Sequence, residues 1–214
     1  MIEIKKDDWW PTPIWCFDID PTQIDFDKVK DEIYRVKKVD EGRTISNYGG
    51  WQSNKLNLNQ NTEMNKLMHN IEEVASHCFD DIGAGENVSR NITDYWININ
   101  KKHNFNIPHN HPLSFLSGVV YIESNKDSGN ILFHRNSAED YYYLELTANK
   151  KGSENNSYGF SYIYYPCTKY KVILFPSYLS HSVEGNKSES DRISISFNFG
   201  KNWEYKKWLN HTSK

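Results

Sequence analysis

The sequence predicts one α+β domain that is mainly β, built as a β-sandwich or distorted barrel with helices on one outer face. Two observations predict this fold class. Two amphipathic segments fill the first half of the chain, and about seven short strand-like segments follow. The chain has 214 residues, enough to bury one substantial core, and it contains no internal repeat or linker.

We therefore expect one domain over residues 1–214. Its helical support region covers residues 1–90, its β core residues 91–200 and its C-terminal tail residues 201–214, which we expect to include a short helix.

The two helices are predicted from apolar residues that recur every three or four positions. This spacing places the apolar side chains on one side of a helix. The first helix is expected over residues 25–38, with Phe26, Val29, Ile33 and Val36 on its apolar side. The second is expected over residues 61–82, where the same spacing joins Met64, Leu67, Ile71, Val74 and Cys78.

A glycine-containing loop, NYGGWQSN over residues 47–54, separates the two helices. Glycines allow the backbone to turn sharply, and the large indole of Trp51 can anchor such a turn by burial. The alternative interpretation is a loop that faces a substrate, in which case Trp51 would contact it.

The second half of the chain predicts strands because apolar and polar residues alternate between breaks rich in glycine, asparagine, serine and proline. A polar stretch over residues 150–157 is expected to be a mobile loop. The expected strands cover residues 95–100, 116–123, 130–134, 141–146, 160–165, 171–175 and 192–199.

Composition excludes several classes of function. The net charge of −3 gives no basic excess of the kind that binds nucleic acid. No apolar run approaches the ~20 residues of a membrane span, and the N-terminus lacks the apolar core of a signal peptide. Cys16, Cys78 and Cys167 are widely spaced and odd in number, so we expect reduced, buried thiols in a cytoplasmic protein, host cytoplasm if the protein is viral.

The most informative feature of the sequence is a histidine pair, His109-Asn110-His111, that is complemented downstream by His181. Residues i and i+2 of a strand share a face, so His109 and His111 can reach one metal together. Eleven residues after His181 comes Arg192-Ile193-Ser194, whose Arg and Ser share a face for the same reason. Three imidazoles can hold a divalent metal, and a guanidinium with a hydroxyl can hold an acidic co-substrate beside it.

These motifs belong to a longer resemblance. The stretches PHNHPLSFLSGVVYI, SGNILFH and VILFPSYLSHSVEGNKSESDRISISFNF resemble the metal-binding and closing halves of iron(II)- and 2-oxoglutarate-dependent oxygenases. More narrowly, they resemble a group of such oxygenases from marine bacteria and phages, related to the prolyl 4-hydroxylase type. That group also has loops like GGWQSN and starts like PTPIW, so the resemblance covers most of the chain. It implies a double-stranded β-helix, the jelly-roll, cupin-like form of a β-sandwich.

The resemblance also implies site residues. His109, His111 and His181 would be the iron ligands, Arg192 would pair with the distal carboxylate of 2-oxoglutarate, and Ser194 and Tyr121 would support the co-substrate. Asn98, Ser117 and Trp51 are expected at the substrate or behind the ligands. Taken by itself, Arg192 can also be an edge-strand charge paired with Asp191 or Glu189. Tyr121 is equally a core aromatic and Asn98 equally a strand-pairing residue, while His134 is better explained as a surface or hydrogen-bonded histidine than as a spare ligand.

One residue departs from the broad superfamily. The usual site has two histidines and one carboxylate, whereas position 111 is a histidine. A neutral imidazole leaves the site one charge more positive, which favours an anionic co-substrate. It also leaves the metal open, since imidazole suits iron, zinc, copper and nickel.

The implied activity is oxidation, expected to be hydroxylation, of an unidentified small-molecule or peptide substrate, with Fe(II), 2-oxoglutarate and O2 consumed or bound and succinate and CO2 released. We expect no nucleic-acid or membrane partner. The oligomeric state is left open, with a homodimer among the options. Two alternatives stand beside this one: a cupin-type metalloenzyme with three histidines, which leaves Arg192 and Ser194 unexplained, and a non-catalytic jelly-roll binding module, which leaves the three histidines unexplained.

Overall fold

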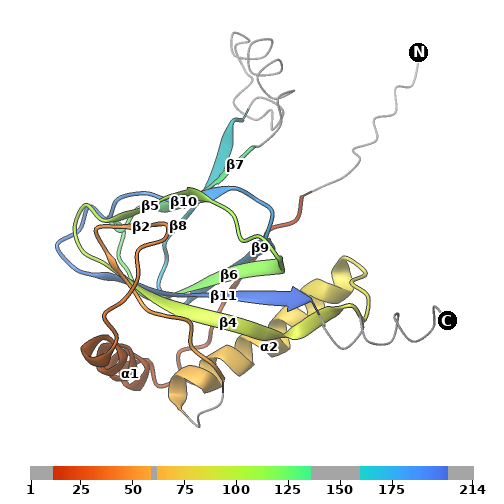
Figure 1. Cartoon of the computed structure of the whole chain (residues 1–214), viewed down its shortest axis with the longest axis horizontal. Helices are drawn as coiled ribbons and strands as arrows, with labels where there is room; N and C mark the ends of the chain where they lie inside the picture. Colours follow the sequence, from red (N-terminus) through yellow and green to blue (C-terminus); the bar gives the residue numbers. More distant parts are fainter. Residues whose placement is uncertain (1–11, 59–61, 136–159, 202–214) are drawn as a thin grey trace.

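Two antiparallel sheets face each other in the computed structural model, which describes residues 12–58, 62–135 and 160–201. Two helices pack against the outer face of one sheet (Figure 1). We call the six-stranded sheet, in the order β1-β9-β6-β11-β4-β3, the major sheet. The five-stranded sheet, in the order β2-β5-β10-β7-β8, is the minor sheet. The predicted mainly-β sandwich with helices on one outer face is confirmed.

The helices are α1, Phe26–Val39, and α2, Glu63–Asp81. The major sheet consists of β1 (Trp15–Asp18), β3 (Trp51–Gln52), β4 (Val88–Asn100), β6 (Ser114–Glu123), β9 (Lys171–Pro176) and β11 (Arg192–Lys201). The minor sheet consists of β2 (Asn47–Tyr48), β5 (Phe105–His109), β7 (Asn130–His134), β8 (Tyr162–Pro166) and β10 (His181–Val183).

At the start of each helix, acidic side chains accept hydrogen bonds from free backbone N–H groups. Asp25 caps α1 by accepting from the N–H of Lys28 at 3.1 Å. Thr62 caps α2, and Glu32 of α1 accepts from the N–H groups of Glu63 and Met64 in its first turn, at 3.0 and 3.1 Å. The Glu63 carboxylate in turn accepts from the N–H of Asp25 at 3.0 Å. Each helix therefore helps to start the other, which fixes the two as a unit.

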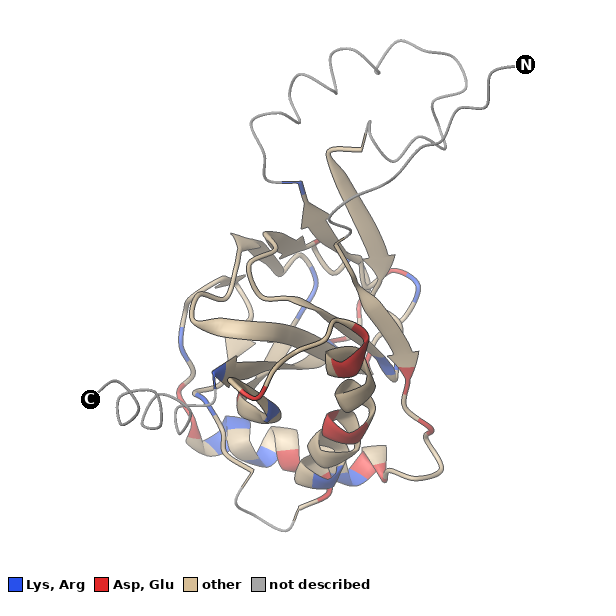
Figure 2. Cartoon of the chain, turned by 90° about the vertical axis from the view of Figure 1, so that its right-hand side faces the viewer, with Lys and Arg blue, Asp and Glu red and all other residues tan. Residues whose placement is uncertain are grey.

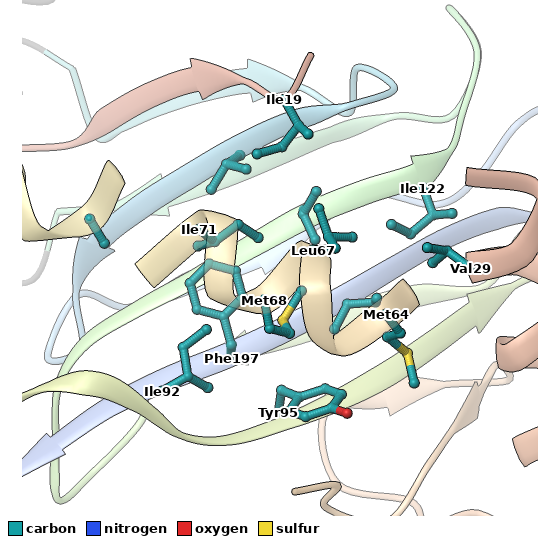
Figure 3. Packing of buried hydrophobic residues seen from close by; sticks show 14 of the residues in the cluster. Ile19, Val29, Met64, Leu67, Met68, Ile71, Ile92, Tyr95, Ile122 and Phe197 are labelled. Carbon is teal, nitrogen blue, oxygen red and sulfur yellow. The ribbon is translucent and has the colours of Figure 1, made fainter. Parts of the chain in front are cut away.

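Strand alternation gives the major sheet two different faces. Along β11, Ile193, Ile195, Phe197 and Phe199 point to the helices and belong to the main core cluster. Figure 3 shows Leu67, Met68 and Ile71 of α2 packed with Phe197 of β11. The residues that alternate with them point to the space between the sheets: Arg192, Ser194, Ser196 and Asn198. One face of β11 thus builds the core and the other is free to build a site.

Charged residues concentrate on the helices, while both sheets carry few of them (Figure 2). Of the described Lys, Arg, Asp and Glu residues, Arg192 is the one that is buried, with 1% of its surface exposed. A buried guanidinium is costly unless its donors are satisfied, so this position calls for a functional or structural partner.

The sequence predicted both helices to within two residues, and each expected strand that lies within the described residues is present, although β4 begins earlier, at Val88. It missed β1, β5, β10 and the two short strands β2 and β3, which are formed by the predicted loop of residues 47–54. The expected strand over 141–146, the loop over 150–157 and the C-terminal helix lie outside the described residues.

Two expectations were wrong in detail. His111 does not follow His109 along a strand, because β5 ends at His109 and the backbone N–H of His111 donates to the Ser177 carbonyl at 3.0 Å. Pro112 follows and prevents the ladder from continuing. Cys16 is exposed rather than buried, since it lies on the edge strand β1, whereas Cys78 and Cys167 are buried as expected; all three are free thiols.

No helix in the described part of the chain is long and apolar enough to cross a bilayer.

Tight packing of the major sheet against the core predicts the effect of a substitution at Gly118. A Cβ there would collide with the Phe197 ring and lie 3.1 Å from the Ile173 carbonyl oxygen. We expect Gly118→Ala to lower the free energy of unfolding in urea by about 1–3 kcal/mol through overpacking. Gly85→Ala is the control: its Cβ would have only the Asn87 amide oxygen nearby, at 3.3 Å, and should change stability by less than about 0.5 kcal/mol. Equal stability of the two variants would contradict this packing.

Candidate functional site

Three histidines meet between the sheets. Among the described residues they form a group of side chains that could hold a metal ion, with one ring nitrogen from each lying within 4.8 Å of the others. His181 begins β10 and pairs directly with His109, the last residue of β5. His111 reaches the same point from the turn that follows β5, where its ring lies 5.0 Å from that of His181. The structure therefore brings the predicted triad together.

The hydrogen bonds of the triad select the nitrogen that is free to bind a metal. The Nδ1 of His109 donates to the Ile107 carbonyl at 2.8 Å, and that of His181 donates to the Leu179 carbonyl at 3.0 Å. A carbonyl only accepts, so Nδ1 must carry the proton and Nε2 keeps its lone pair. The Nδ1 of His111 lies 2.7 Å from Asn198 Oδ1 and 2.8 Å from Ser117 Oγ. Such outer partners orient imidazoles for metal binding.

Burial keeps all three imidazoles neutral. It lowers the pKa of His109, lowers the pKa of His111 to about 4 and lowers the pKa of His181 well below its ordinary value. Neighbouring histidines act in the same direction on His181. Neutral imidazole is the form that ligates metals, so the site is ready to bind one at neutral pH.

Arg192 and Tyr121 are the second feature of the site, and both are almost fully buried. The Arg192 Nη1 donates to the carbonyls of Ser128 and Glu184 at 2.6 and 2.8 Å, which fixes the guanidinium. Its Nη2 has no hydrogen-bond partner, and neither has the hydroxyl of Tyr121. Burial raises the pKa of Tyr121 well above its ordinary value, so its hydroxyl remains a donor.

Both unsatisfied groups line the same cavity as the three histidines. Arg192 and Ser194 reach it from one face of β11, as predicted from their spacing, and Ser196 reaches it from the same face. Ser194 lies between Tyr121 of β6 and Asn98 of β4, its direct neighbours in the two flanking strands. Beside the histidines the cavity is thus lined by hydroxyl, amide and guanidinium groups, which suit a carboxylate.

Of the other expected residues, Asn98 and Ser117 lie at or behind the site, whereas Trp51 does not. Asn98 lines the cavity, and its Nδ2 donates to Ser196 Oγ at 3.1 Å. Ser117 is fully buried behind His111, to which it is hydrogen bonded. Trp51 is not among the cavity residues, because its ring packs against the core on the helix side and its N–H donates to the Asp40 carbonyl at 3.1 Å. His134 is hydrogen bonded to Ser182 Oγ at 2.8 Å and is not part of the triad.

Sequence reasoning missed Asn198 and Ser46. Asn198 was recognisable in principle, because it continues the face of β11 that carries Arg192 and Ser194. Ser46 Oγ lies 3.2 Å from Nε2 of His109 and 63 residues away in sequence. No local pattern indicates that contact, because β2 brings this segment to β5 only in the folded sheet.

A comparison with known protein families gives a match to part of the chain. The sequence model of the family described as "Putative 2OG-Fe(II) oxygenase" matches residues 94–198, which include all three histidines and Arg192. This segment, just under half of the chain, is similar to that oxygenase family. No curated protein matches the sequence. The oxygenase is therefore an iron- and 2-oxoglutarate-dependent enzyme, and the histidine triad and the polar end of the cavity fit these two requirements.

Solved structures support the fold of the oxygenase. A prolyl-4-hydroxylase from Pseudomonas putida is similar with a TM-score of 0.60 and 10% identity, over 89% of this chain and 94% of that one. A prolyl hydroxylase from Trichoplax adhaerens, in complex with a hypoxia inducible factor peptide fragment, has a TM-score of 0.63 and 12% identity, over 92% and 86%. HygX from Streptomyces hygroscopicus, with nickel and 2-oxoglutarate bound, has a TM-score of 0.59 and 11% identity, over 90% and 84%. The double-stranded β-helix predicted from the sequence is confirmed.

Proposed function

We propose that His109, His111 and His181 hold the iron of this oxygenase and that Arg192, Tyr121 and Ser194 hold its 2-oxoglutarate. The enzyme would hydroxylate an unidentified substrate and release succinate and CO2. Iron and 2-oxoglutarate together supply the activation of O2 when both are bound. The chain contributes the ligands, the anion-binding groups and a cavity between two sheets.

One observation carries the co-substrate assignment: the guanidinium of Arg192 is buried with Nη2 unsatisfied, beside the unsatisfied hydroxyl of Tyr121. Leaving a buried donor without a partner costs about 1–3 kcal/mol, and more for a charged group. A carboxylate of 2-oxoglutarate would accept from both groups and remove that cost. The side chains of both residues line the cavity that the histidines close, which suits a ligand with one end at the metal.

Arg192 is prepared for this task by its remaining donors. Because Nη1 is fixed by the Ser128 and Glu184 carbonyls, the guanidinium keeps its orientation before any ligand arrives. Preorganised donors bind an anion without a further loss of side-chain entropy. An arginine also offers a planar fork that a lysine lacks, which explains the residue type at position 192.

The histidines contribute geometry and charge. Each would present Nε2 to the metal, with Nδ1 held by Ile107, by Leu179 or by Asn198 and Ser117. The resulting ligand set is neutral, so iron in it keeps its full positive charge and favours an anionic co-substrate. Ser46, next to Nε2 of His109, would lie at the edge of the metal site.

The substrate class is a small molecule or a peptide. The structural relatives include a hydroxylase bound to a peptide fragment and HygX with hygromycin B bound, so this fold accepts both kinds of ligand. We further propose that residues 1–214 act as one domain. The three free thiols favour a reducing compartment, so we propose a cytoplasmic location.

The first prediction concerns the metal. His109→Ala, His181→Ala and His111→Ala should each abolish stoichiometric binding of Fe(II) or Ni(II), because two imidazoles do not complete one face of a metal. Calorimetric titration under anaerobic conditions measures this. His134→Ala is the matched control on the neighbouring strand β7 and should bind metal normally. Full metal retention by the His111 variant would remove that residue from the ligand set.

The second prediction concerns the co-substrate. Arg192→Ala should leave metal content unchanged but weaken 2-oxoglutarate binding by tens-fold or more, since losing a buried charged pair costs about 2–5 kcal/mol. Arg192→Lys keeps the charge without the fork and should bind with intermediate affinity. Thermal unfolding checks that both variants fold. Unchanged affinity in the Ala variant would assign Arg192 a purely structural role.

The third prediction concerns turnover. Purified protein with Fe(II), ascorbate, O2 and labelled 2-oxoglutarate should release CO2 slowly even without substrate, through uncoupled decarboxylation. A cupin-type enzyme would show metal-dependent chemistry that does not require 2-oxoglutarate. A binding module would show no metal-dependent chemistry at all. The assignment would be contradicted if the iron-loaded protein bound no 2-oxoglutarate by calorimetry and also released no CO2 with any member of a broad panel of metabolites and peptides.

A further inference from the structure

His111 differs from the other two histidines in what holds its Nδ1. In His109 and His181 that nitrogen donates to a backbone carbonyl two residues earlier, and a carbonyl has no alternative role. The partners of His111 are side chains, the Asn198 amide and the Ser117 hydroxyl. An amide has an oxygen that accepts and a nitrogen that donates, and a hydroxyl does both. These partners alone therefore leave the tautomer of His111 undetermined.

The hydrogen bond made by the amide nitrogen of Asn198 removes this ambiguity. Its Nδ2 donates to Asp94 Oδ1 at 3.0 Å. An ionised carboxylate only accepts hydrogen bonds, so it takes the amide nitrogen and turns the amide oxygen towards His111 and Ser117. With the amide reversed, two acceptor oxygens would face each other at that distance, and Nδ2 would point at Nδ1 of His111. The proton of His111 would then move to Nε2, the nitrogen that the metal needs.

The strands hold this arrangement in place. Asn198 of β11 lies directly opposite Asp94 of β4 on one side and Ser117 of β6 on the other. Ser117 Oγ donates to the same amide oxygen at 2.8 Å and lies 2.7 Å from Ser177 Oγ. The second oxygen of Asp94 is occupied by Lys55 Nζ at 2.8 Å. Only when the amide oxygen faces His111 does Asp94 Oδ1 meet a donor on Asn198 rather than a second acceptor.

We propose that Asp94 is a positioning residue that acts through Asn198 to fix His111 as the Nδ1–H tautomer, with Nε2 free for the metal. The proposal rests on the proposed function for the role of His111 as a ligand. It also explains how a site with three neutral ligands retains a carboxylate nearby: the negative charge lies two hydrogen bonds behind the ligand rather than on the metal.

Asp94→Asn tests the proposal with the smallest change of shape. The amide introduced at this position can face Asn198 with its oxygen or with its nitrogen, so both orientations of the Asn198 amide become accessible. We expect nitrogen-15 NMR of the metal-free protein to report a mixture of His111 tautomers, with His109 and His181 unchanged. Zn(II) affinity by calorimetry should fall about tenfold, within the 10–100-fold range for outer partners of ligands.

The exchanged double variant, Asp94→Asn with Asn198→Asp, separates this role from a purely structural one. It conserves charge and places a carboxylate directly at Nδ1 of His111, with an amide donor behind it. We expect it to restore a single Nδ1–H tautomer and to bring Zn(II) affinity back to within about threefold of the unmodified protein, because the acceptor-only partner is restored.

Two controls complete the experiment. Lys55→Met removes the ion pair on the other oxygen of Asp94, and Asp18→Asn makes the same chemical change at a carboxylate paired with Lys171 on the edge strand β1. Both should keep the tautomer and the affinity. A single Nδ1–H tautomer in Asp94→Asn, or failure of the double variant to restore it, would overturn the proposal. If the unmodified protein showed the Nδ1–H tautomer of His111 but bound no metal, the proposed function would be contradicted. The role of Asp94 in setting the tautomer would stand.

Discussion

The pairing of β11 with β4 on one side and β6 on the other is the constraint on which the rest of the structure depends. Because side chains alternate along a strand, this central position sends Ile193, Ile195 and Phe197 into the core under the helices. The same alternation sends Arg192 and Ser194 into the cavity. A shift of one residue would exchange the two sets and bury a guanidinium in the core. The apolar face therefore fixes the register, and the register places the polar face.

The apolar core and the polar cavity make opposite energetic demands on the same strands. Burial of the helix-facing side chains stabilises the fold. The cavity instead holds a buried charge with an unsatisfied nitrogen, an unsatisfied phenol and three uncharged imidazoles. Such groups are tolerated when a ligand completes them and the surrounding structure is rigid. Under the proposed function, iron and 2-oxoglutarate are the ligands that would complete these groups.

The triad is held by two different means. His109 and His181 are oriented by the backbone of their own segments, so their tautomers depend only on local conformation. His111 is oriented by side chains from β6 and β11, so its orientation depends on the pairing of these two strands. The histidine that replaces the usual carboxylate is thus the one whose orientation depends on long-range contacts.

The sequence by itself determined the two helices, most of the strands and the residue types of the site. Apolar periodicity reports burial directly, and the spacing of Arg192 and Ser194 reports a shared strand face. Only the tertiary structure decided that β5 ends at His109, that Trp51 packs away from the cavity, and that Ser46, Asp94 and Asn198 lie behind or beside the three histidines. These contacts join segments that are distant in sequence, and a single polar residue carries no periodic signal. Pairing between strands brings such residues together, and the pairing is set by the core that all the strands share.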